Sequence, residues 1–171
     1  MKERVIKMAI EYSLMLKEMQ LSTCTFFDEM RKLGIEIDKS KIETLEKGIQ
    51  IYEFYDTLGC SFALMDTSHF QFGFESEYLM DEFKNQQELS FRINKLFDRD
   101  RAIVNMLMIV FHVIDTIDTD CIFEFNGDTI RLARLNEIMY IKPGEGFWDN
   151  EKFKRFIEER EYQWLKPDEK I

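Results

Sequence analysis

Residues 121–141 read CIFEFNGDTIRLARLNEIMYI, and this stretch decides the fold class. Its side chains alternate with a period of two, which is typical of strands that present two different faces. Asn126-Gly127 interrupts the alternation and favours a tight hairpin, because both residues tolerate a positive φ. Asn136-Glu137 marks a second turn. We therefore predict an antiparallel meander of three strands, at residues 121–125, 130–135 and 138–141.

The segment before the meander predicts a buried helix. Residues 102–114 are apolar on nearly every face, and a helix of this kind must be covered on several sides. Asp98 or Asp100 can cap its start, because a carboxylate accepts hydrogen bonds from the free amides of the first turn. We interpret this helix as the centre of the core.

Upstream of the buried helix, the first predicted element is a strand within residues 6–16, where every even position is apolar. A helical period also fits its first half, so a helix remains the alternative. Ser22 or Thr23 can cap a following helix, which ends where Gly34 allows a left-handed conformation. We also expect strands at 35–37, 49–55, 61–65 and 89–93, and a short acidic helix at 75–83.

The C-terminal region predicts one more helix, starting near Asp149. The polar residues from Lys166 to Ile171 predict a frayed tail. Hairpins combined with separate helices give the fold class α+β. We predict a single domain over residues 1–171, with a mostly antiparallel sheet packed against two or three helices.

The charge of the chain limits its partners. There are 33 acidic and 23 basic residues, giving a formal net charge of −10. This excess disfavours nucleic acid and anionic membranes, which are themselves negatively charged, and favours a basic protein partner. Solubility alone also explains an acidic surface.

Neither a signal peptide nor a membrane span is expected, because no apolar stretch has the required length and composition. Cys24, Cys60 and Cys121 are far apart and odd in number, which favours buried reduced thiols over disulfides or a zinc site. These features predict a cytoplasmic protein.

Catalytic patterns are weak. His112 and Asp115 are three residues apart on the predicted central helix, so they could form a base with an orienting carboxylate. A histidine satisfied by its neighbour explains the same pattern, and His69 is more typical of a loop or strand position. Motifs for a phosphate loop, a metal site or a nucleophile elbow do not occur. We predict no catalytic residue, no cofactor and no metal.

The predicted partner-binding residues are acidic. Residues 115–128 contain five acids and no Lys or Arg, which indicates either a solvated face or a docking surface for a basic partner. Exposed aromatic residues between 52 and 74 could anchor such a partner. The acids are Asp115, Asp118, Asp120, Glu124 and Asp128, and the candidate anchors are Tyr52, Phe54, Tyr55, Phe70, Phe72 and Phe74.

One region resembles a known family. Residues 75–148 contain Ser90-Phe91-Arg92 at a strand end, then the helix, then Phe125-Asn126-Gly127 before a hairpin, and finally Phe147-Trp148. This run resembles the Sit-type immunity proteins of bacterial polymorphic toxin systems. The resemblance implies a non-enzymatic inhibitor that binds a cognate toxin encoded beside it, and it carries over no catalytic residue. The alternatives are a small hydrolase using His112 and Asp115, and an adaptor or self-assembling protein that forms homo-oligomers.

Overall fold

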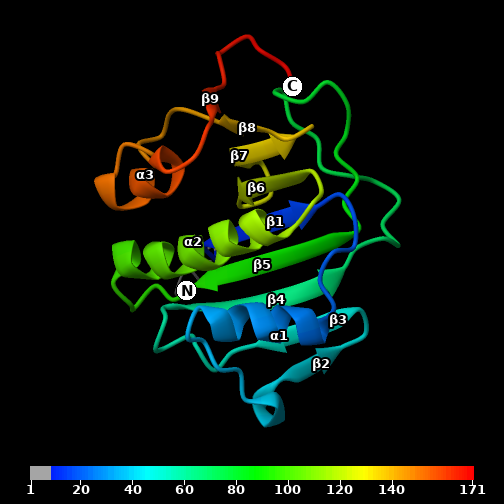
Figure 1. The fold of residues 1–171 in the computed structure, drawn as a ribbon, viewed down its shortest axis with the longest axis vertical. Coiled ribbons are helices and arrows are strands. Elements are labelled where there is room, and N and C mark those ends of the chain that lie inside the picture. The colour runs from blue at the N-terminus through cyan, green and yellow to red at the C-terminus, as the bar shows by residue number, and fades with distance from the viewer. Residues whose placement is uncertain (1–8) are drawn as a thin grey trace, which may run out of the picture.

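The computed structural model describes residues 9–171, and its strands form one nine-stranded sheet (Figure 1). The strand order is β2-β3-β4-β5-β1-β6-β7-β8-β9, and every pair is antiparallel except β8–β9. The predicted α+β class is confirmed. The elements are β1 (Glu11–Leu16), α1 (Thr23–Lys32), a 3-10 helix η1 (Lys39–Lys41), β2 (Glu43–Leu45), β3 (Gly48–Ile51), β4 (Cys60–Asp66), β5 (Gln87–Ile93), α2 (Arg99–Thr116), β6 (Cys121–Phe125), β7 (Thr129–Leu135), β8 (Ile138–Ile141), α3 (Glu151–Glu158) and β9 (Gln163–Trp164).

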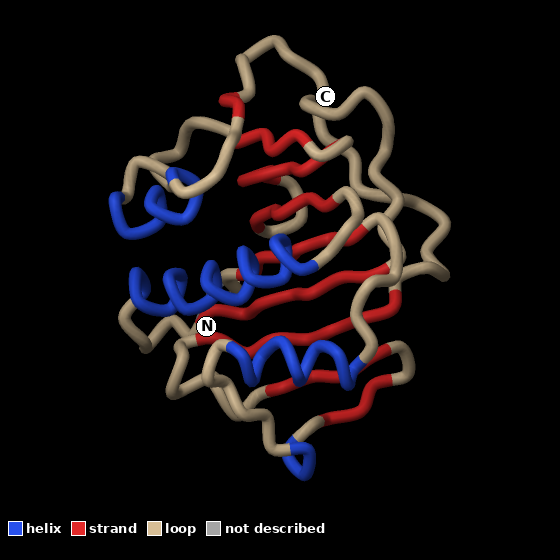
Figure 2. The backbone as a smooth tube through the Cα atoms, viewed as in Figure 1, coloured by secondary structure: helices blue, strands red, loops and turns tan. Residues whose placement is uncertain are grey.

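The helices α1, α2 and α3 cover one face of the sheet, as Figures 1 and 2 show. All three contribute to one hydrophobic core with the strands beneath them. The predicted central helix is confirmed as α2, because nine of its residues are buried. The Asp98 carboxylate caps it by accepting from the Arg101 amide at 2.7 Å.

The predicted first strand is confirmed as β1, which lies in the middle of the sheet between β5 and β6. Leu14 and Leu16 face the helices, whereas Met15 belongs to a smaller apolar cluster on the opposite face of the sheet. We call this opposite face the second face. A strand buried on both faces must alternate less clearly than a half-exposed one. Ile6 and Met8, which also entered the prediction, lie outside the described residues.

The meander is confirmed as β6, β7 and β8. Both turn residues are left-handed in each hairpin, with φ of 53° at Asn126, 83° at Gly127, 50° at Asn136 and 68° at Glu137. Positive φ at both central residues matches the right-handed twist of the paired strands.

Two predictions on the second face are wrong. Residues 75–83 form no helix; instead, Phe74 and Phe83 exchange two backbone hydrogen bonds of 2.8 Å. Leu79 and Phe83 pack against the sheet, so tertiary burial determines the conformation of this segment. The chain end is not frayed either, because the Ile171 amide donates to the Tyr78 carbonyl at 2.8 Å.

Smaller differences concern residues elsewhere. Residues 35–37 are not part of the sheet. The strand predicted at 49–55 ends at Ile51, because the Tyr55 amide donates to the Tyr52 carbonyl at 2.9 Å and closes a turn. The helix α3 is capped by Asn150 rather than by Asp149. Cys60 and Cys121 are buried free thiols, as predicted, whereas Cys24 is exposed because it lies on the solvent side of α1.

Candidate functional site

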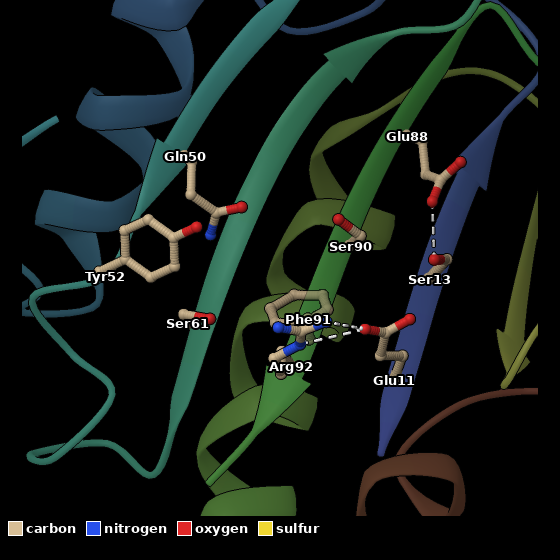
Figure 3. A pocket seen from close by; sticks show the side chains of 9 residues that line it. All are labelled: Glu11, Ser13, Gln50, Tyr52, Ser61, Glu88, Ser90, Phe91 and Arg92. Atoms are coloured by element: carbon tan, nitrogen blue, oxygen red, sulfur yellow. Dashed lines mark hydrogen bonds and ion pairs between the residues drawn. The ribbon is translucent and has the colours of Figure 1, made fainter. Parts of the chain in front are cut away.

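The second face of the sheet divides into two halves. Over β6 and β7, the segment 75–83 and the chain end bury the smaller apolar cluster. Over β1, β3, β4 and β5, the face is hollowed, and the hollow has a volume of about 310 Å³ (Figure 3). We call this hollow the serine hollow, because Ser13, Ser61 and Ser90 line it.

Strand register explains why these residues meet. Directly opposed residues on neighbouring strands point to the same face, and so do residues two positions along each strand. Two rows of mainly small or polar side chains therefore cross the sheet. One row is Gln50, Ala63, Ser90, Ser13 and Glu124, and the other is Ser61, Arg92 and Glu11.

Two acidic side chains stand at opposite ends of the serine hollow. Glu11 is paired with Arg92, whose Nη2 lies 2.7 Å from the Glu11 Oε1. Glu88 accepts a hydrogen bond of 2.7 Å from the Ser13 hydroxyl (Figure 3). Because Arg92 is neutralised by Glu11, Glu88 leaves the hollow with net negative charge.

The floor contains hydroxyl groups with unused hydrogen-bonding capacity. The hydroxyls of Ser61 and Ser90 make no hydrogen bond with residues 9–171, and both residues line the hollow. Ser61 is only 2% exposed as a residue, but its oxygen is not among the fully buried side-chain atoms that lack a partner in the described part of the chain. The oxygen therefore reaches the hollow, where water or a ligand can supply the hydrogen bond. Ser61 and Ser90 can therefore bind a polar group that enters the hollow.

Glu124 lies beside the hollow and is buried, with 5% exposure. Its carboxylate accepts from the Gly127 amide at 2.5 Å. The pKa of Glu124 is raised to about 7, mainly by burial, with a smaller contribution from the negative charge of Glu88. The Glu124 carboxyl thus binds a proton more readily than an exposed glutamate does.

A second hollow adjoins the first and shares Glu88 with it. It has a volume of about 450 Å³ and is lined partly by Met65, His69 and Phe70. Phe70 is 62% exposed, Phe72 is 81% exposed, and Tyr52 at the serine hollow is 53% exposed. Three of the six predicted anchors are therefore exposed, whereas Phe54, Tyr55 and Phe74 are half-buried.

The five acids predicted from the sequence do not share one surface. Asp115, Asp118 and Asp120 lie near the C-terminal end of α2 and the start of β6. Asp128 is in the hairpin beyond the other end of β6, roughly 15 Å away at the usual rise per residue. Glu124 is buried between these two positions, on the second face of the sheet.

Four of these acids have partners within the fold. Glu124 accepts from the Gly127 amide, and Asp128 accepts from the Thr129 hydroxyl at 2.7 Å. Asp115 forms a two-pronged ion pair with Arg160, at 3.1 and 2.5 Å. Asp120 pairs with Lys17 at 3.2 Å and accepts from the Asn136 amide at 2.8 Å. The side chain of Asp118 is exposed, and it makes no hydrogen bond or ion pair with residues 9–171.

The pair of His112 and Asp115, considered as the alternative, does not form, because each residue has another partner. The Nε2 atom of His112 lies 2.8 Å from a carboxylate oxygen of Glu29, which projects from α1. Lys32 binds the other oxygen of Glu29 at 2.7 Å and holds the pKa of that carboxyl below its usual range. Glu29 was missed, although an acid three residues after Phe26 falls on the apolar side of that helix.

Comparison with known proteins provides the family. A family model described as SitI3-like matches residues 10–152. The chain belongs to the SitI3-like family. This confirms the resemblance to Sit-type immunity proteins. No curated protein and no solved structure matches the chain.

The SitI3-like match covers every strand that lines the serine hollow, from β1 to β5. Within the described residues of this SitI3-like protein, no helix combines the length and apolar character required to cross a membrane. Residues 9–171 also contain no group of three or more His, Cys, Asp or Glu side chains placed to hold a metal ion.

Proposed function

We propose that this SitI3-like protein is a non-enzymatic immunity protein that binds a cognate bacterial toxin in the cytoplasm and neutralises it by direct contact. The observation that carries the proposal is the SitI3-like match over residues 10–152, which covers most of the chain. Inhibition by binding needs a surface rather than a reacting group. The engagement of His112 by Glu29 supports this view, because it ties the imidazole into the contact between α1 and α2.

The charge of the protein favours a basic target such as a nuclease. A net charge of −10 attracts a cationic partner over distances of about 8–10 Å at physiological salt. We propose that the exposed acids Asp115, Asp118 and Asp128, with the partly buried Asp120, contribute to this attraction. Glu124 is buried, so it is not part of the exposed surface that attracts the partner. Interfaces of this class bury about 1,200–2,000 Å² in total.

The test uses the toxin domain encoded beside the gene of this protein. We expect the two purified proteins to form a complex of fixed stoichiometry, and cells that produce both to survive toxin expression. Binding is expected to weaken as salt rises, because screening reduces attraction between exposed charges. A toxin that kills cells equally with and without this protein, and that forms no complex with it, would refute the proposal.

A matched control separates binding from catalysis. His112→Ala removes the imidazole that an enzymatic mechanism would use. Protection of cells by this variant at the level of the wild type supports neutralisation by contact, whereas loss of protection with unchanged toxin binding would favour an enzyme.

A further inference from the structure

We propose that the serine hollow receives a basic side chain of the toxin, with Glu88 as its counter-ion; this rests on the proposed function. Glu88 stands where the two hollows of the second face meet. A lysine or arginine entering there would pair with a carboxylate that is otherwise bonded to one hydroxyl, that of Ser13. Such charge-assisted hydrogen bonds are about twice as strong as neutral ones.

The other groups in the hollow match the donors of a basic side chain. The hydroxyls of Ser61 and Ser90 have unused acceptor positions, and the side-chain oxygen of Gln50 adds another at the same site. An arginine has five N–H donors and a lysine has three, so either can bind several of these oxygens together. The exposed ring of Tyr52 offers a face on which a cation can stack.

Charge selects a cation over an anion. Glu11 neutralises Arg92, the only basic side chain that lines the serine hollow among the described residues. The Ser13 hydroxyl donates to Glu88, and Glu124 lies opposite Ser13 on the neighbouring strand, so a cation at this place would also offset repulsion between the two carboxyl groups when both are ionised.

The surroundings favour a protein partner over a free small molecule. Small-molecule sites are lined mostly by apolar side chains, whereas polar or charged side chains make up most of the lining of the serine hollow. Exposed Tyr52 and Phe70 stand at the two adjoining hollows. Aromatic anchors around a desolvated charge are typical of the energetic centre of protein interfaces.

The decisive experiment measures binding of the same toxin domain by Glu88→Lys and by a matched control, Glu159→Lys. Both substitutions change the net charge by the same amount, but Glu159 is exposed at the end of α3, away from the serine hollow, and is not one of the acids proposed to attract the toxin. We expect Glu88→Lys to weaken binding roughly 30-fold or more, since it places like charges together inside the interface. Glu159→Lys is expected to weaken binding by less than about 3-fold, because it affects only long-range attraction.

The outcomes separate the two proposals. If the wild type binds and Glu88→Lys binds as tightly, the serine hollow is not the docking site, and the immunity function stands. If Glu159→Lys weakens binding as strongly as Glu88→Lys, the loss reflects net charge, and the assignment of the serine hollow fails. If the wild type itself binds no toxin, both proposals fail.

A second variant guards against a folding defect. Glu88→Gln keeps the shape of the side chain and its acceptor for Ser13, and its fold is checked by circular dichroism and thermal unfolding. We expect it to weaken binding about 10-fold and to flatten the salt dependence, whereas Glu159→Gln is expected to leave both nearly unchanged. Equal effects of these two variants would overturn the assignment of Glu88.

Discussion

Glu124→Gln is expected to remove a specific loss of stability at high pH. In the folded protein, burial raises the pKa of Glu124 to about 7, from an ordinary value of 4.5. The folded state therefore holds a proton between these pH values that the unfolded state has lost. Raising the pH through this window destabilises the wild type, because the folded state must ionise a buried carboxyl.

The expected magnitude follows from the two pKa values. At 1.36 kcal/mol per pH unit, the difference between 4.5 and about 7 corresponds to about 3 kcal/mol of unfolding free energy. Glutamine resembles the protonated carboxyl, and its oxygen can still accept from the Gly127 amide. The variant should exceed the wild type by about 1 kcal/mol at pH 5 and by about 3 kcal/mol above pH 8.

The assay is urea unfolding at a series of pH values from 5 to 9, followed by the fluorescence of the tryptophans, of which Trp148 is buried. Asp118→Asn is the control for net charge and is expected to run parallel to the wild type. Glu88→Gln should lower the pKa of Glu124, since it removes a neighbouring negative charge. A stability difference between Glu124→Gln and wild type that stays constant from pH 5 to pH 9 would refute this reasoning.

Three further predictions concern other parts of the fold. In the native protein, only Cys24 is expected to react with a thiol reagent, because burial raises the pKa of each of the other two thiols to about 12; native labelling of two or three thiols would contradict this. Gly59→Ala is expected to lower the unfolding free energy by roughly 3 kcal/mol, since φ is +80° and the added methyl would overlap the ring of Phe97. Gly34→Ala, with φ of +76° in open space, should lose only about 1 kcal/mol, and equal losses would show that the contact does not matter. Glu29→Ala is expected to lower the unfolding free energy by roughly 1–3 kcal/mol, because it removes the acceptor of His112; a change below about 0.5 kcal/mol in the same assay would show that the pair contributes nothing.

Much of the fold could be predicted from local signals. Asn126-Gly127 identifies a hairpin because few residue pairs accept its conformation, and the apolar length of α2 identifies a helix that must be covered. Residues 75–83 could not be predicted in the same way. Their acids suggested a helix, but Leu79 and Phe83 are held by contacts with strands about forty residues later.

The candidate site had almost no local signal. Ser13, Ser61 and Ser90 come from three distant segments, and only the strand order β4-β5-β1 places them side by side. Taken alone, each of these serines is typical of a polar position on a half-buried strand. The aromatic run and the acidic excess indicated a binding surface, yet the position of Glu88 in it depends on register across the sheet.

The central place of β1 has a consequence for synthesis of the protein on the ribosome. Its two neighbours in the sheet, β5 and β6, end at Ile93 and Phe125, so the first strand to emerge waits for partners that emerge much later. At the usual rates of translation, about 5–20 s separate the appearance of β1 from that of β6. During this interval, an apolar strand without its full set of partners is exposed to neighbouring nascent chains and chaperones, and the sheet closes around β1 only when β6 has emerged.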